Sequence, residues 1–329
     1  MKNILVTGGA GYIGSHTVRR LLKEGFNVVV IDNLYHGHRE SIPSNVKFYK
    51  EDLENYKKVS DICLQEKIDA VIHFAAFIEA GDSMKDPLSF YENNVRNTIN
   101  LLSALETSGV RKIIFSSTAA VFGDPEEVPM NETSKKDPIN IYGKTKLMIE
   151  TILKDVASVE KLNYGILRYF NAAGADEDGD IGEDHDPETH LIPLILQVPL
   201  QKREKVFIFG NDYPTKDGTC IRDYIHVNDL ADAHILALRK LIETDENFEY
   251  NLGSGSGYSV KEVIETCEDV IGESIPKEIV EKRLGDAPIL IADSSKIKVE
   301  LKWAPKYDLK AIVKTAWNWH KNNPEGYKK

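Results

Sequence analysis

The chain has 329 residues, of which 42% are hydrophobic and 28% are charged, and its formal net charge is −11. This composition is ordinary for a globular protein, and the length is sufficient for two lobes. The acidic balance without clustered basic segments argues against a nucleic-acid or membrane partner, and no apolar run is long enough to span a bilayer.

The first predicted elements are a strand at Asn3–Thr7 and a helix at Tyr12–Glu24, with a glycine-rich loop between them. Gly8, Gly11 and Gly14 give this loop a G-x-x-G-x-x-G pattern. Gly8 and Gly11 allow a tight turn close to a pyrophosphate, and Gly14 allows the helix and strand to pack closely. The free N–H groups at the start of the helix favour an anion. The loop therefore predicts dinucleotide binding.

The second predicted strand, Val28–Ile31, ends at Asp32, eighteen residues after Gly14. A carboxylate at this position accepts hydrogen bonds from the adenosine ribose hydroxyls and repels a 2′-phosphate. The pattern therefore predicts NAD rather than NADP as the cofactor.

Strands and helices continue to alternate through the first half of the chain. Further strands are predicted at Val46–Tyr49, Ala70–Phe74, Lys112–Ser116 and Gly165–Arg168, and further helices at Tyr56–Glu66, Leu88–Thr107 and Ile139–Ser158. Such alternation is typical of a doubly wound α/β fold, in which a parallel Rossmann-like sheet carries helices on both faces.

The alternation stops after Asn171, where an acidic, glycine-containing segment over residues 175–188 predicts a loop. Beyond it we expect a second, smaller mixed α/β lobe. Its predicted helices are Leu191–Gln201, Asn228–Ile242, Val260–Val270 and Leu309–His320, and its strands are Val206–Phe209 and Glu249–Leu252. We therefore expect an NAD-binding domain over residues 1–171 and a substrate lobe over residues 172–329, with room for parts of the second to pack on the first. The cleft between them is the expected ligand site.

Hydroxyl side chains follow the fifth predicted strand, in the segment Phe115–Gly123. Polar groups at the carboxyl end of a strand face the ligand in open α/β sheets. A hydroxyl there can hydrogen-bond an oxygen that a neighbouring base deprotonates, although such hydroxyls also cap turns.

Tyr142 and Lys146 stand four residues apart at the start of the next predicted helix, so their side chains share one face. Of the fourteen tyrosines, only Tyr142 has a lysine four positions later. Lowering the pKa of a phenol from about 10 toward neutrality requires ~4 kcal/mol. An adjacent ammonium and a positively charged nicotinamide can supply this by favouring the phenolate. We therefore expect Tyr142 to act as a base.

The three cysteines, Cys63, Cys220 and Cys267, are widely spaced and form no C-x-x-C motif. This pattern favours a reducing compartment, and the first strand begins too early to leave room for a signal peptide. We therefore expect a cytoplasmic protein. The nine histidines are scattered and none pairs with a carboxylate at helical ligand spacing, so no metal site is predicted.

Together these motifs resemble the extended short-chain dehydrogenase/reductase family over essentially the whole chain, and within it the UDP-glucose 4-epimerases. The matching segments are Thr7–His16, His73–Ala76, Asn93–Val95, Leu167–Asn171, Ile208–Pro214, Asp217–Thr219, Ile221–Val227 and Asn251–Gly253. The resemblance implies an isomerase of galactose metabolism that interconverts UDP-glucose and UDP-galactose through a transient 4-keto sugar and tightly bound NAD. It also implies a homodimer, formed through the helices Leu88–Thr107 and Ile139–Ser158.

The resemblance further implies the residues of the site. The catalytic triad is Thr118, Tyr142 and Lys146, with Thr118 where most members have Ser. Besides the glycine loop, Tyr142 and Lys146, the implied cofactor contacts are Tyr12, Ile13, Asp32, Asn33, Asp52, Leu53, Phe74, Ala75, Asn93 and Tyr169. Besides Thr118, the implied nucleotide-sugar contacts are Asn171, His190, Phe209, Arg222, Arg283, Asp286 and Leu290.

Three positions depart from the family pattern or vary within it. Ile78 stands where relatives usually have Lys, so no charged contact is expected there, and His190 stands where many have Asn. Leu290 falls where these enzymes vary a residue that resembles a gate on the sugar pocket. Leucine at a gate predicts a preference for unmodified hexoses, whereas the alternative is an ordinary packing residue.

The sequence also allows other functions. The chain could be a 4-epimerase for a UDP-N-acetylhexosamine, a UDP-pentose or a UDP-uronate. A nucleotide-sugar 4,6-dehydratase shares the first step, which forms the 4-keto sugar. Such enzymes resemble this chain but carry an Asp-Glu pair after the strand-end hydroxyl. Ala119 and Ala120 follow Thr118 here, which disfavours it. A non-catalytic NAD-sensing module would not need Tyr142 and Lys146 together with a sugar-nucleotide lobe.

Overall fold

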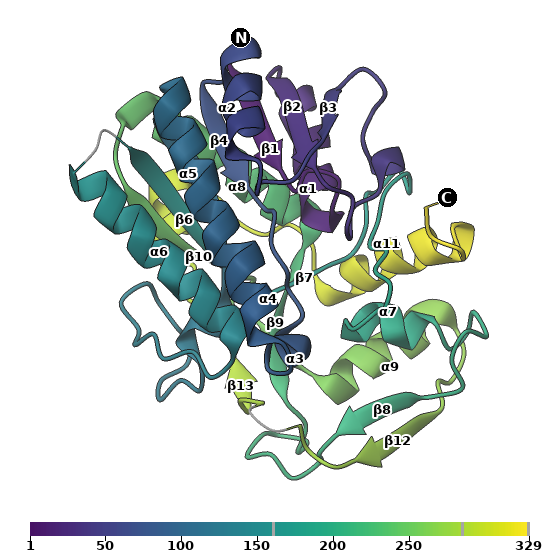
Figure 1. Ribbon diagram of the computed structural model, residues 1–329. Helices are drawn as coiled ribbons and strands as arrows, with labels where there is room; N and C mark the ends of the chain where they lie inside the picture. The colour runs from purple at the N-terminus through teal and green to yellow at the C-terminus, as the bar shows by residue number, and fades with distance from the viewer. Residues whose placement is uncertain (160–161, 284–285, 328–329) are drawn as a thin grey trace.

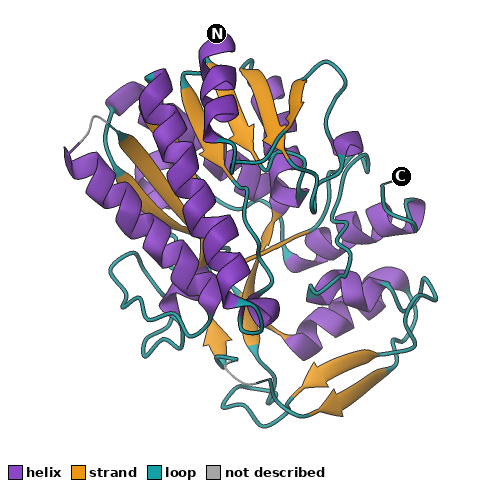
Figure 2. Ribbon diagram, in the orientation of Figure 1, coloured by secondary structure: helices purple, strands orange, loops and turns teal. Residues whose placement is uncertain are grey.

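The computed structural model describes residues 1–159, 162–283 and 286–327. Its largest feature is a seven-stranded parallel sheet in the order β10-β6-β5-β4-β1-β2-β3, with helices on both faces (Figures 1 and 2). The strands are β1 (Asn3–Thr7), β2 (Asn27–Asp32), β3 (Lys47–Lys50), β4 (Ala70–His73), β5 (Lys112–Thr118), β6 (Asn163–Tyr169) and β10 (Phe248–Leu252). This arrangement confirms the predicted Rossmann-like fold.

The helices around this sheet form two layers. They are α1 (Tyr12–Lys23), α2 (Tyr56–Gln65), α5 (Asn97–Ser108), α6 (Ile141–Val159), α8 (Val227–Thr244) and α10 (Ser295–Leu301). Because successive side chains of a strand point to opposite faces, Ile4 and Val6 of β1 pack in one core with residues of α1 and α8. Leu5 packs in a second core with residues of α2, α5 and α6. The sheet is therefore covered on both faces, as its apolar strands require.

The smaller lobe is built around β9 (Ile221–His226). This strand pairs in parallel with β7 (Asn171–Ala173) and β13 (Ile289–Leu290) and antiparallel with β11 (Gly257–Ser259). The remaining elements of the lobe are β8 (Val206–Phe209), β12 (Lys277–Val280), α7 (Leu191–Leu196), α9 (Val260–Ile271) and α11 (Leu309–Asn322). A third hydrophobic core joins the two sheets of this lobe to its helices.

The remaining elements are short. They are α3 (Ala80–Ser83), α4 (Pro87–Phe90), a π-helical segment η2 (Tyr91–Arg96), and the 3-10 turns η1 (Arg39–Ser41) and η3 (Ala119–Phe122). The predicted helix Leu88–Thr107 is thus α4, η2 and α5 in succession. π-helical turns inside helices are frequent at functional sites, and η2 carries the predicted cofactor residue Asn93.

Two elements that were predicted in the smaller lobe belong to the large sheet and its helices instead. Strand β10 pairs with β6, and helix α8 packs beside α1. Periodicity identifies the strand and the helix but not where each packs in the fold. Strand β10 returns to the large sheet about 80 residues after β6. The division at residue 171 stays a prediction.

One predicted helix was too long. The prediction ended it at Gln201, whereas α7 ends at Leu196. Pro199 has no amide hydrogen to continue the helix, and it disfavours helical backbone at the residue before it. None of the helices in the described part of the chain combines the length and the apolar character that a membrane span requires.

Candidate active site

The glycine loop forms a cradle between β1 and α1. Gly8 has a φ of 71°, and a Cβ there would lie 2.5 Å from the amide nitrogen of Ala75. A Cβ on Gly14 would lie 2.2 Å from the carbonyl oxygen of Gly8, so only glycine fits at either position. No side chain caps the start of α1, where Gly11 is the first flanking residue. The exposed amides and the close backbone suit a pyrophosphate.

Asp32 lies at the end of β2, beside this loop. Its carboxylate accepts hydrogen bonds from the amide nitrogens of Ala10, at 2.9 Å, and Leu34, at 2.8 Å. Burial raises the pKa of Asp32, although these amides oppose the shift. Nearby, the Asn33 side chain donates to Asp52 at 2.7 Å. Asp32 is therefore held rigidly at the position where a dinucleotide fold binds the adenosine ribose.

Thr118, Tyr142 and Lys146 come together where β5 ends and α6 begins. The backbone amide of Tyr142 donates to the Ser83 hydroxyl at 3.1 Å, which fixes the first turn of α6. Lys146 lies one turn later, and its Nζ donates to the carbonyl oxygen of Ser116 at 3.0 Å. The same Nζ lies 6.0 Å from the centroid of the Tyr142 ring. The predicted spacing thus brings the lysine beside the tyrosine.

Burial dominates the electrostatics of this pair. Burial raises the pKa of Tyr142 to about 12, although a hydrogen bond with Thr118 opposes the shift. Burial also lowers the pKa of Lys146 to about 7, against the effect of Glu150. The largest effect on each group is therefore the loss of solvent around it.

Below the pair lies a buried ionic network that the sequence analysis missed. Glu150, one turn after Lys146, accepts hydrogen bonds from Arg168 Nε at 2.7 Å and from the Ser117 hydroxyl at 2.6 Å. The side chains of Arg168 and Glu150 are 0% and 1% exposed. Glu249 forms a second ion pair with Arg168. The network ties α6 to β5, β6 and β10 and so positions the two residues above it.

A single cavity of about 720 Å³ connects these groups with the smaller lobe. It is lined by the following predicted site residues: Gly8, Gly11, Tyr12, Ile13, Gly14, Asp32, Asn33, Asp52, Leu53, Phe74, Ala75, Asn93, Thr118, Tyr142, Tyr169, Asn171, His190, Phe209, Arg222, Arg283 and Asp286. Lys146 lies behind Tyr142 and is buried. Leu290 does not line the cavity, because it packs against a small cluster that includes Phe122 and Met130. Its role as a gate stays a prediction.

The far end of the cavity carries two arginines from separate segments of the smaller lobe. The guanidinium of Arg222 is 3.5 Å from the carboxylate of Asp286, and that of Arg283 lies 3.8 Å from the centroid of the Phe209 ring. Guanidinium groups bind phosphate oxygens in a bidentate manner, so this end suits a diphosphate.

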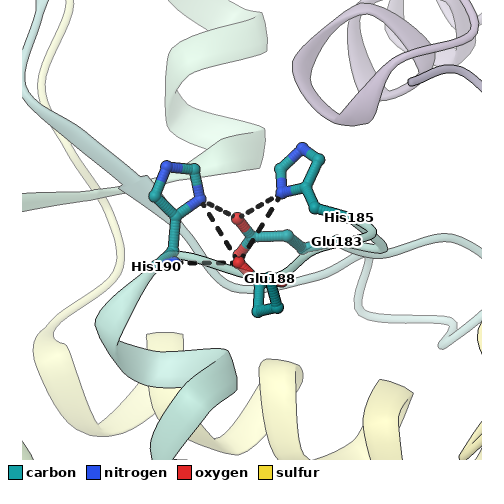
Figure 3. Close-up of side chains that lie close together, drawn as sticks. All are labelled: Glu183, His185, Glu188 and His190. Carbon is teal, nitrogen blue, oxygen red and sulfur yellow. Dashed lines mark hydrogen bonds and ion pairs between the residues drawn. The ribbon is translucent and has the colours of Figure 1, made fainter. Parts of the chain in front are cut away.

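Four side chains form a cluster that was not predicted, and three of them, Glu183, His185 and His190, line the cavity. Glu183, His185, Glu188 and His190 converge in the loop before α7 (Figure 3). Burial lowers the pKa of His185, but the two glutamates outweigh it and raise the value to about 10. The prediction of scattered histidines is wrong for this loop. Helical spacing could not reveal the cluster, because only the folded loop brings these four residues together.

Comparisons with known proteins agree on one group. Residues 4–253 match the model of the NAD dependent epimerase/dehydratase family. The UDP-glucose 4-epimerase of Halalkalibacterium halodurans is 53% identical over 98% of this chain and 97% of its own length. A solved UDP-glucose 4-epimerase, 50% identical, covers both chains completely with a TM-score of 0.97. The UDP-glucose 4-epimerase of Bifidobacterium longum, solved with NAD+ and UDP, is 38% identical, with a TM-score of 0.94 and 99% and 100% of the two chains covered.

Proposed function

The chain belongs to the NAD dependent epimerase/dehydratase family, and we propose how its own residues interconvert UDP-glucose and UDP-galactose. The chemistry is reversible 4-epimerisation of the UDP-hexose, and NAD is the cofactor. One observation carries the assignment of residues. The phenol of Tyr142 lines the same cavity as the glycine loop at one end and Arg222 and Arg283 at the other. Bound NAD supplies the hydride acceptor and donor at ring carbon 4.

Tyr142 takes the proton from the 4-hydroxyl of the sugar and returns it to the 4-keto sugar after that sugar has turned over. The Thr118 hydroxyl lowers the pKa of the phenol and can orient it toward this oxygen. Lys146 is anchored by the carbonyl oxygen of Ser116 and holds its Nζ beside the phenol. The three side chains therefore provide a base, its orientation and a nearby amine that is positive when protonated.

Arg222 and Arg283 hold the diphosphate while the sugar moves. Their side chains come from β9 and from the segment before β13, so they can bind phosphate oxygens from two sides. Asn171, Phe209 and Asp286 line the cavity beside them. Anchoring the UDP at this end leaves the sugar able to present either face at the other.

The product of the reaction tests this function against the dehydratase. We expect incubation with UDP-glucose to yield UDP-galactose without loss of water, because Ala119 and Ala120 follow Thr118 and can serve neither as acid nor as base. Mass spectrometry distinguishes the two outcomes, and incubation from UDP-galactose provides the reverse control. A nucleotide sugar lighter by one water molecule would contradict the proposal.

Asp32→Ala is expected to weaken the retention of NAD. The substitution removes the carboxylate at the ribose position and also the acceptor of the Ala10 and Leu34 amides. NAD released on denaturation of the purified protein should be close to one per chain for the wild type and clearly lower for the variant. Asp61→Ala, on an exposed face of α2, is the matched control. Equal cofactor content in Asp32→Ala and Asp61→Ala would remove Asp32 from the cofactor site.

We also propose that the chain forms a homodimer through α5 and α6. The two helices lie at the surface on one side of the molecule (Figure 1). Ile99 of α5 and Met148 of α6 are 45% and 43% exposed, and Leu88 of α4 is 74% exposed. Exposed apolar side chains on these helices favour association. Light scattering should give twice the mass of one chain, and Met148→Lys should shift this toward the monomer. A wild-type monomer would contradict the proposal.

The cytoplasmic location is part of the same proposal. All three cysteines are free thiols buried in the fold. Burial raises the pKa of the Cys220 thiol, which keeps it protonated although it lines the cavity. These observations agree with a reducing compartment.

A further inference from the structure

The loop between β7 and α7 brings two carboxylates and two imidazoles together. Glu183, His185, Glu188 and His190 lie within eight residues of one another in the sequence, and one possible ligand atom from each lies within 4.8 Å of the others. Figure 3 shows the two imidazoles on one side of the two carboxylates, with their Nδ1 atoms turned toward the carboxylate oxygens. The four groups thus face a common centre.

The two carboxylates of this cluster are buried with no lysine or arginine of the described chain beside them, whereas His190 is 46% exposed. The side chains of Glu183 and Glu188 are 3% and 5% exposed, and that of His185 is 11% exposed. Within the described residues, neither glutamate forms an ion pair with a lysine or arginine, and His185 and His190 are their only ionic partners. Two buried carboxylates require about two compensating positive charges. The two imidazoles supply them when protonated, and a single divalent cation can replace both protons.

One distance in the cluster equals the edge of a small tetrahedral site, and two others are somewhat longer. The His185 Nδ1 atom lies 3.4 Å from a Glu183 oxygen and 3.8 Å from a Glu188 oxygen, and His190 Nδ1 lies 4.0 Å from the same Glu188 oxygen. A tetrahedron with metal–ligand bonds of about 2.0–2.1 Å has edges of about 3.4 Å. The remaining contact is a direct hydrogen bond between His190 and Glu183, which the ion would replace.

We propose that Glu183, His185, Glu188 and His190 bind a divalent transition-metal ion, with zinc as the best match. Two imidazole nitrogens and two carboxylate oxygens form a donor set that suits zinc better than magnesium or calcium, which prefer oxygen ligands alone. Four protein ligands complete a tetrahedral shell, and zinc sites of this kind are structural. The ion would therefore stabilise the cavity wall rather than act on the sugar.

The surroundings of the cluster hold its ligands in place. Glu188 accepts hydrogen bonds from the backbone amides of Thr189 and His190, at 2.7 Å and 2.8 Å. The indole of Trp319, in α11, donates to the backbone carbonyl of Glu183 at 3.1 Å. Partners of this kind orient metal ligands and raise the affinity of a site. The loop is thus anchored at the carboxylate of Glu188 and at the backbone of Glu183 before any ion binds.

Zinc binding to the purified holoenzyme tests the proposal. The protein is treated with a chelator, desalted, and titrated with zinc in competition with a chromophoric chelator. We expect one zinc ion per chain, a higher midpoint of thermal unfolding with zinc, and no comparable effect of magnesium. Cobalt in place of zinc should give the intense visible absorption bands of a tetrahedral ion.

Variants locate the ion. Glu188→Gln keeps the shape of the side chain, and His185→Asn replaces the imidazole by a shorter amide. Each should weaken zinc binding at least ~100-fold, since loss of a residue that merely hydrogen-bonds a metal ligand already lowers metal affinity 10–100-fold. His38→Gln is the matched control, because His38 contacts the same loop at Asp184 but is not a ligand. Retention of NAD by each variant shows that it is folded. Failure of the wild type to bind one zinc ion would overturn the proposal. Unchanged binding by both cluster variants would overturn it too, and would move the ion to another group such as the Cys220 thiol.

Discussion

Tyr142→Phe is expected to lower the turnover of UDP-galactose at least ~100-fold, the lower range for loss of a general acid or base. The substitution removes only the phenolic oxygen, so the ring keeps its packing between the cofactor cradle and the sugar end of the cavity. The arginines are unchanged, and binding of UDP should therefore be retained. Steady-state rates and calorimetric titration with UDP measure the two effects separately.

Two further variants sharpen this result. Tyr250→Phe removes the hydroxyl of another buried tyrosine, which donates to Glu300 on the far edge of the sheet, and should leave turnover close to the wild-type rate. Lys146→Met should lower turnover strongly, because it removes the amine that lies beside the Tyr142 ring and stabilises the phenolate when protonated. Near-normal turnover of Tyr142→Phe would exclude Tyr142 as the base, whatever the behaviour of the controls.

The sequence predicts the first half of the fold well because its signals are local. The run from β1 through the glycine loop to α1 depends on neighbouring residues alone, and the alternation that follows implies the layers. The second half depends on contacts between distant segments. The segment Ile221–Val227 was predicted as a family motif but not as a strand. It contains β9, which is the centre of the smaller sheet. Its partners β7, β11 and β13 are two or three residues long, too short for any periodicity.

The same contrast holds for the site. Gly8, Gly14 and Asp32 are readable because their chemistry requires fixed spacing along the chain. Lys146 was placed correctly beside Tyr142, but its pKa depends on burial, which the sequence does not show. Glu150 follows Lys146 by one helical turn, yet its importance appears only when Arg168 is seen to reach it from β6.

Glu150→Gln is expected to lower the free energy of unfolding by about 3 kcal/mol. Removing one member of a buried ion pair costs ~3–5 kcal/mol, because the remaining charge is left without compensation. We expect the lower end of this range, since Glu249 keeps its ion pair with Arg168. Chemical denaturation of the holoenzyme, followed by circular dichroism, measures the change.

An exposed ion pair provides the matched comparison for this effect. Glu54 lies 3.3 Å from Arg96, and their side chains are 69% and 55% exposed. Glu54→Gln should therefore change the free energy of unfolding by no more than ~1 kcal/mol, because exposed pairs are screened by solvent. Turnover adds a second readout, since α6 carries Tyr142 and Lys146 above Glu150. If Glu150 positions these residues, Glu150→Gln lowers turnover even where the protein is fully folded, whereas Glu54→Gln does not. Equal effects of the two variants on stability would show that burial of the Arg168 network adds nothing to the fold.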